Sequence, residues 1–170
     1  MNVFEAISER RSIRTYKNRA IEEDVLHKVL EAGRLAPSAS NRQEWKFVVV
    51  RDPEKRAKLV EMTYGQRWVG EAPAIIVACA TEGKSVMTCG QATHTVDLSI
   101  ACTMMLLEAW EQGLGTCWLG TFNVEGVKKA LDIPAHMRVV TMIPMGYPNE
   151  EPAQRPRKAF DQIVCFDKYR

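Results

Sequence analysis

The chain has 170 residues, of which 46% are hydrophobic and 26% are charged, and its formal net charge is +2. This length suits one domain, so residues 1–170 are expected to form a single folded unit. The small net charge gives no support for nucleic-acid binding, no apolar run approaches the roughly 20 residues that cross a membrane, and no signal peptide is visible. The five cysteines are widely spaced without a C-x-x-C pair, which favours reduced thiols in a cytoplasmic protein and no metal site.

Helices and strands alternate in the first half of the chain. Short helices are predicted over residues 2–9 and 21–35, the second ending near Pro37 because the residue before proline disfavours helical backbone. The β-branched runs over residues 45–50 and 74–80 predict two buried strands. Between them, Asp52 and Pro53 are a typical helix start, so a helix is predicted from there to about residue 62.

The longest predicted helix covers residues 92–112. Its stretch from Leu98 to Trp110 carries one charged residue, Glu108. A helix that is apolar on nearly every face must be covered on every face, and few other elements of this chain can do so. We therefore predict that this helix packs at a homodimer interface. The alternative is a central core helix in a monomer.

The second half of the chain predicts two strands, one helix and an extended arm. A short strand is expected over residues 117–119 and a core strand over residues 138–145, with a helix over 124–131 between them. Residues 146–156 are rich in proline, glutamate and arginine, which is typical of extended chain. Apolar side chains return near the end, at Phe160, Ile163, Val164 and Phe166. The segment 146–170 is therefore predicted to lie on a partner subunit, where those side chains would be covered.

Two clusters of basic residues point to a phosphate-bearing ligand. The first comprises Arg10, Arg11, Ser12 and Arg14, and the second comprises Arg155, Arg157 and Lys158. A guanidinium offers two parallel donors to a phosphate and stays charged. The alternative for the first cluster is a solvated helix end, where cations complement the helix dipole.

Other polar motifs are less specific. The loop over residues 37–43 offers Ser38, Ser40, Asn41 and Gln43, which could bind the edge of a heterocycle or simply form a turn. Gly113 and Gly115 do not form a dinucleotide fingerprint, because its third glycine would fall on Trp118. His94 lies three residues before Asp97 on a predicted helix, which favours a local polar contact between them.

Taken in order, these motifs resemble the nitroreductase family of FMN-dependent enzymes. The resemblance rests on residues 10–16, 36–43, Trp45, 113–120, 146–148 and 155–158. It implies an α+β fold with a central mixed β-sheet flanked by helices. It also implies an intertwined homodimer with a swapped C-terminal arm and two FMN molecules at the subunit interface.

The resemblance also implies particular cofactor-binding residues. Arg10, Arg11, Ser12 and Arg157 would hold the FMN phosphate and ribityl chain, and Arg14 would reach the pyrimidine edge of the flavin. Pro37, Ser38, Ala39 and Ser40 would come from the partner subunit, and Gln66, Cys117, Trp118, Leu119 and Gly120 would lie near the ring. NADH or NADPH would pass hydride to FMN N5, and a nitroaromatic, quinone or similar small-molecule acceptor would then take it in a ping-pong cycle.

Two departures from the family pattern bear on the substrate. Glu44 stands where the family usually has proline, and the segment 64–73 is short, which leaves the site open. Two other functions stay open. One is different flavin chemistry on the same scaffold, such as substrate dehydrogenation, reductive dehalogenation or flavin destruction. The other is an anion-binding module without turnover.

Overall fold

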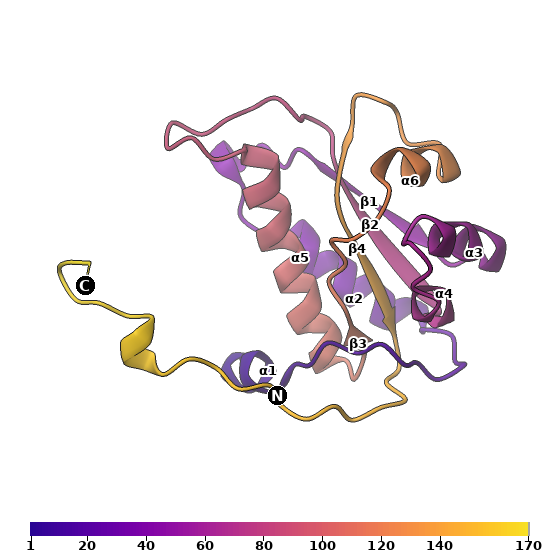
Figure 1. Ribbon diagram of the computed structural model, residues 1–170, viewed down its shortest axis with the longest axis horizontal. Coiled ribbons are helices and arrows are strands. Elements are labelled where there is room, and N and C mark those ends of the chain that lie inside the picture. Colours follow the sequence, from indigo (N-terminus) through magenta and orange to yellow (C-terminus); the bar gives the residue numbers. More distant parts are fainter. Residues whose placement is uncertain (170) are drawn as a thin grey trace.

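A computed structural model describes residues 1–169 and shows an α+β fold, with one four-stranded sheet between two layers of helices (Figure 1). The strands are β1 (Trp45–Val50), β2 (Ala74–Ala80), β3 (Gly115–Thr116) and β4 (Arg138–Gly146). The α-helices are α1 (Val3–Glu9), α2 (Glu23–Arg34), α3 (Pro53–Glu61), α4 (Trp68–Glu71), α5 (Thr93–Glu111) and α6 (Val124–Ala130). Two 3₁₀ helices, η1 (Ala39–Asn41) and η2 (Phe160–Gln162), complete the set; these two and α4 were not predicted.

The sheet has the strand order β1-β2-β4-β3, and every pair of neighbouring strands is antiparallel. The prediction of a mixed sheet is therefore wrong for these four strands. Among residues 1–169, parallel pairing is confined to a single bridge between Ser12 and Thr116. That bridge matters for the site, because it attaches the arginine-rich N-terminal loop to the sheet.

The strand predicted over residues 117–119 lies two residues too late in the sequence. β3 ends at Thr116, although the chain continues beside β4 in the same register as far as a bridge between Leu119 and Met142. Pro144 lies opposite Cys117 in this register and accepts a hydrogen bond from its N–H at 3.3 Å. Because proline has no N–H to return, the ladder is interrupted there.

β2 is buried along its whole length and divides the hydrophobic core in two. Its residues Ala74, Ile76 and Ala78 pack with α2 and α5 on one face of the sheet. Ile75, Val77 and Cys79 pack with α3, α4 and α6 on the other face. Alternate side chains of a strand point to opposite faces, so an unbroken apolar run is what a central strand with two covered faces requires.

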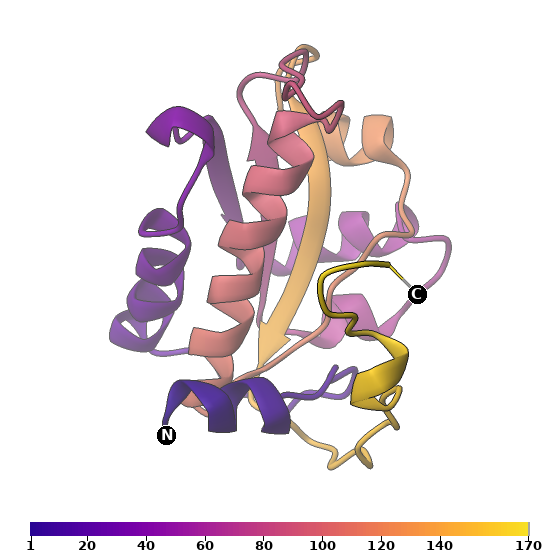
Figure 2. The same cartoon turned by 90° about the vertical axis from the view of Figure 1, so that its left-hand side faces the viewer.

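α5 keeps one apolar stripe uncovered by its own chain. Val96, Met104 and Leu107 are partly exposed along this stripe, and Ile100 is 37% exposed. The stripe continues into a groove that α1 lines together with Met104 and Leu107, and Figure 2 shows α1 crossing the lower end of α5. The chain itself therefore does not cover α5 on every face. Within residues 1–169, none of the helices is apolar over enough length to cross a bilayer.

The chain beyond Gly146 has little regular structure. It first runs beside the N-terminal loop, with a bridge between Tyr16 and Pro148, and its last part then extends away from the body of the molecule (Figure 1). The apolar side chains of Phe160, Ile163 and Phe166 are exposed there. The swapped arm accordingly stays a prediction, and these side chains are the ones that a partner would cover.

Candidate functional site

A pocket of arginines lies where the N-terminal loop meets the C-terminal segment. Its lining consists of Arg10, Arg11, Ser12, Arg14, Pro152, Ala153, Arg155 and Arg157. We call these residues the arginine pocket. The five guanidiniums come from segments about 140 positions apart in sequence, and no carboxylate is among the lining residues. Such a concentration of like charge is costly unless an anion shares the space, so the arrangement is suited to a phosphate.

Backbone hydrogen bonds on two sides fix the N-terminal loop. On one side, the N–H of Ile13 donates to the carbonyl of Thr116 at 2.9 Å, just beyond the end of α5. On the other side, the Thr15 carbonyl accepts from the N–H of Asn149 at 2.9 Å, and the Glu150 carboxylate accepts from the N–H groups of Arg14 and Thr15. The loop therefore presents its arginines from a fixed backbone rather than from a mobile turn.

The three N-terminal arginines have different surroundings. Arg11 donates from its guanidinium to the carbonyls of Ser8, Glu9 and Arg10, which cap the C-terminal end of α1. The carbon of the Arg14 guanidinium lies 5.7 Å from the centroid of the Trp68 ring. Within residues 1–169 the Arg10 guanidinium has no hydrogen-bond or ion-pair partner, so its donors are available to a ligand. For Arg11, the structure therefore shows the alternative interpretation of the sequence, a cation at the C-terminal end of a helix.

The segment from Cys117 to Gly120 forms the next part of the site. Cys117 and Leu119 are buried, so they can offer a ligand little more than backbone, whereas Trp118 is 38% exposed and Gly120 is open to solvent. Burial raises the pKa of the Cys117 thiol, against the lowering effect of the nearby Arg14 and Ser12. The Cys117 thiol is therefore protonated at neutral pH and is not a nucleophile in this state.

Gln66 uses its amide donors within the chain. Its Nε2 donates to the Thr63 carbonyl at 3.0 Å and to the Thr121 carbonyl at 3.2 Å. These bonds join the turn before α4 to the residue that follows Gly120. The side-chain oxygen of Gln66 is therefore the atom that remains for a ligand.

Gly115 connects the arginine loop to the end of α5. A Cβ at this position would lie 2.6 Å from the Cβ of Ile13, so Gly115→Ala is expected to displace Ile13 and to lower the free energy of unfolding by about 1–3 kcal/mol. Urea unfolding measures the loss. Hydrogen exchange at the Ile13 amide is expected to become faster in this variant, because displacing Ile13 weakens the hydrogen bond from its N–H to the Thr116 carbonyl.

Gly113→Ala is the matched control for that variant. Gly113 has a φ of +76° and ends α5, but a Cβ there would meet nothing within 4 Å. Alanine at this φ is expected to cost about 1–2 kcal/mol while exchange at Ile13 stays unchanged. Equal exchange at Ile13 in both variants would contradict the close packing of Gly115 against that residue.

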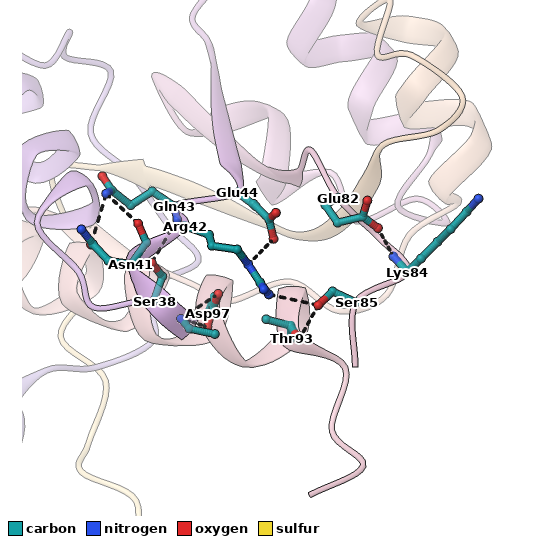
Figure 3. Close-up of polar contacts among 11 residues, drawn as sticks. Ser38, Asn41, Arg42, Gln43, Glu44, Glu82, Lys84, Ser85, Thr93 and Asp97 are labelled. Atoms are coloured by element: carbon teal, nitrogen blue, oxygen red, sulfur yellow. Dashed lines mark hydrogen bonds and ion pairs between the residues drawn. The ribbon is translucent and has the colours of Figure 1, made fainter. Parts of the chain in front are cut away.

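The polar loop over residues 38–43 lies at the opposite end of α5. Asp97, in the first turns of α5, accepts hydrogen bonds from the N–H of Ala39 on both carboxylate oxygens, at 3.1 and 3.2 Å (Figure 3). Asp97 and Glu111 are fourteen positions apart along α5, so about 20 Å of helix lies between this loop and the arginine pocket. One chain thus does not bring Pro37, Ser38, Ala39 and Ser40 to the arginines.

The contact predicted between His94 and Asp97 is wrong. The Asp97 carboxylate is directed to Ala39, and the Nδ1 atom of His94 is buried without a hydrogen-bond partner among the described residues. Sequence reasoning missed Asp97, Glu150 and Trp68 as residues that hold the site loops. Asp97 did carry a signal, because it is a carboxylate directly before the mostly apolar stretch that begins at Leu98. Within residues 1–169 no three His, Cys, Asp or Glu side chains gather as a metal site.

Comparison with known proteins agrees with the fold and the order of motifs. The model of the "Nitroreductase family" matches residues 7–82 and 61–147. A protein of Methanothermobacter thermautotrophicus, with the provisional name NADH dehydrogenase/NAD(P)H nitroreductase, is 36% identical over 91% of this chain and 82% of the relative. Bacillus subtilis FMN reductase [NAD(P)H] is 27% identical over 98% of this chain and 74% of the relative.

Two further matches extend the comparison. Iodotyrosine deiodinase 1 of Sus scrofa is 28% identical over 95% of this chain and 67% of the relative. The solved structure of an FMN-dependent nitroreductase from Clostridium difficile R20291 superimposes with a TM-score of 0.85 at 30% identity, over 98% of this chain and 99% of that chain. The fold is therefore nitroreductase-like, and the chain belongs to the nitroreductase family.

Proposed function

We propose that this protein is an FMN-dependent oxidoreductase that takes hydride from NADH or NADPH and reduces nitroaromatic, quinone or similar acceptors. The arginine pocket is the observation that carries the proposal, because its guanidiniums meet without a carboxylate and are suited to the phosphate of FMN. The names of the Bacillus subtilis and Clostridium difficile proteins support the choice of cofactor and donor.

The residues of the arginine pocket would hold the phosphate and ribityl end of FMN. Arg10, Ser12 and Arg157 would donate from their side chains, and Arg11 would add charge while its guanidinium caps α1. Arg14 would face the pyrimidine edge of the flavin, where a cation stabilises negative charge. Around the ring we place the Gln66 side-chain oxygen and the segment formed by Cys117, Trp118, Leu119 and Gly120.

A homodimer would complete the site. A two-fold axis across the middle of α5 would pack the exposed stripe of one chain against the same stripe of its partner, antiparallel. The 38–43 loop of each chain would then lie at the end of α5 where its partner has the arginine pocket. In this way Pro37, Ser38, Ala39 and Ser40 of one chain would reach the flavin held mainly by the other.

The chain's contribution to the reaction is binding, orientation and charge. When bound, FMN supplies hydride transfer at N5, first from the nicotinamide donor and then to the acceptor. The charged side chains that line the arginine pocket are all guanidiniums. They therefore act as fixed positive charge and move no proton.

Reductive dehalogenation is the second candidate, favoured by the similarity to iodotyrosine deiodinase 1. It would use the same cofactor site with a halogenated aromatic acceptor. The short segment between Tyr64 and Pro73 contains only the four-residue helix α4, which leaves little chain to close over such an acceptor. Nitroaromatic or quinone reduction at an open site is therefore the preferred function.

The visible absorption spectrum of the purified protein tests the cofactor, and anaerobic addition of NADH or NADPH then tests the donor. A flavin band that bleaches is expected, after which a nitroaromatic, a quinone and an iodotyrosine are compared as acceptors. A band that does not bleach would favour other flavin chemistry. No flavin band after addition of FMN would overturn the proposal in favour of an anion-binding protein.

A further inference from the structure

Asp97 is a carboxylate at a buried position, where an apolar side chain would lose less solvation free energy. It is 4% exposed and is the acidic residue that α5 buries among Leu98, Ala101 and Cys102. Within residues 1–169 its carboxylate accepts from a single donor, the N–H of Ala39, on Oδ1 at 3.1 Å and Oδ2 at 3.2 Å. Burying a carboxylate for one neutral donor costs free energy compared with a leucine of similar size. Fold stability alone therefore gives no reason for this residue.

The loop that Asp97 holds has a strained backbone. Ser40, Asn41 and Gln43 have φ values of 53°, 54° and 54°, in the left-handed region that non-glycine residues rarely adopt. Each such residue costs on the order of 1 kcal/mol or more and persists only where the surroundings hold it. Three residues of this kind within four positions require strong external restraints.

Within the loop, the N–H groups of Asn41 and Arg42 donate to the carbonyls of Ser38 and Ala39, and side-chain contacts restrain its later residues. The Ser38 hydroxyl accepts from the N–H of Gln43 at 3.0 Å, and Arg42 donates to the Ser85 hydroxyl at 3.0 Å and to Glu44 at 3.2 Å (Figure 3). These contacts fix residues 42–44. At the start of the loop, Asp97 is what ties the backbone of Ala39 to the rigid helix α5.

We propose that Asp97 is a positioning residue for the flavin site: it holds the Ser38–Ser40 backbone in the strained conformation in which the loop meets the flavin of the partner subunit. The inference rests on the proposed function, because it assigns the loop to that flavin. Asp97 touches the loop and not the cofactor. Its effect on FMN passes through the Ala39 hydrogen bonds, and it would set the affinity and orientation of the ring rather than the chemistry.

The test compares Asp97→Ala with Asp97→Asn in the 170-residue chain. Asp97→Ala is expected to weaken FMN binding by roughly 10-fold or more, because the half-buried N–H of Ala39 loses its acceptor and the loop relaxes. It is also expected to speed hydrogen exchange of the 39–43 amides in the cofactor-free protein. Asp97→Asn keeps one acceptor oxygen, so its FMN affinity is expected to fall between those of the unmutated protein and Asp97→Ala.

Asp52→Ala is the matched control. Asp52 is also a carboxylate that accepts from backbone N–H groups, those of Glu54 and Lys55 at 2.8 and 3.0 Å, but it lies at the start of α3 on the other side of the sheet. This variant is expected to lose some stability while its FMN affinity and the exchange of residues 39–43 stay unchanged. All measurements are made well below the unfolding transition of each variant.

Three results would overturn the inference. The first is unchanged exchange in the 39–43 loop of both Asp97 variants. The second is faster exchange with unchanged FMN affinity. The third is an affinity loss no greater than that of Asp52→Ala. Failure of the proposed function looks different, since the unmutated protein would then bind no FMN. If Asp97→Ala does not fold, Asp97→Asn gives the same readouts, and unchanged loop exchange and FMN affinity in it would overturn the inference.

Discussion

Arg10→Ala is expected to weaken FMN binding by roughly 10- to 100-fold, because a hydrogen bond to a charged group contributes about 1.5–3 kcal/mol. The Arg10 guanidinium lines the arginine pocket and has no partner of its own within residues 1–169. Its removal therefore breaks no hydrogen bond or ion pair among the described residues, while it would leave the phosphate one donor short. Titration of the cofactor-free protein with FMN, followed by flavin fluorescence, measures the loss.

Arg11→Ala is the matched comparison, since it removes the same charge from the next position. The Arg11 guanidinium is occupied with the carbonyls of Ser8, Glu9 and Arg10, so its loss is expected to weaken FMN binding only about 3-fold, as a more distant charge would. It is expected instead to lower stability slightly through the end of α1. Equal losses from the two variants would contradict a direct Arg10–phosphate contact and leave only the summed charge of the pocket. Arg157 is an intermediate case, because its Nη1 donates to the carbonyls of Arg155 and Pro156 at 3.0 and 3.4 Å, so Arg157→Ala is expected to weaken FMN binding less than Arg10→Ala does.

The regular elements of the fold could be predicted because their patterns are local. β1 and β2 begin and end where the apolar runs do, and the caps at Asp52 and Gly113 place the start of α3 and the end of α5. The errors come from contacts between distant segments. β3 ends at Thr116 because Pro144, on the neighbouring strand β4, has no N–H to donate. Whether two neighbouring strands are parallel or antiparallel depends on how the chain connects them.

The candidate site was predicted in part for the same reason. Residue types suited to phosphate could be recognised in the sequence, and the fold does bring Arg10, Ser12 and Arg157 together. Sequence could not show that Arg11 would be occupied by a helix end, because that depends on the geometry of α1. Nor could it show that Ser38 and Ser40 lie a helix length away from the arginines, since that separation is set by the packing of α5.

Glu44, the departure from the family pattern, has a local role in the structure. It accepts from the Arg42 guanidinium at 3.2 Å, and Arg42 also reaches the hydroxyl of Ser85. Proline at this position could not make that pair. The loop is thereby tied to the segment between β2 and α5, which a sequence comparison alone could not reveal.

Ile100→Glu is expected to separate the proposed homodimer into monomers and to weaken FMN binding by roughly 100-fold. Ile100 lies on the exposed stripe of α5, so glutamate fits the isolated chain without entering its core. In a dimer built on this stripe, the two-fold axis would bury both carboxylates without partners, at a cost of several kcal/mol. Sedimentation equilibrium measures the change in mass, and flavin fluorescence measures the change in affinity.

Lys58→Glu is the control, because it introduces the same carboxylate at an exposed position on α3, on the other side of the sheet. It is expected to remain dimeric and to bind FMN normally. The arginine pocket is intact in both variants, so a loss of FMN affinity in Ile100→Glu alone would mean that a partner supplies part of the site. In the proposed homodimer that part is the 38–43 loop, since about 20 Å of α5 separates it from the arginines of its own chain. A monomeric unmutated protein, or an Ile100→Glu dimer with normal affinity, would contradict this assembly, and the site would then have to be complete within one chain.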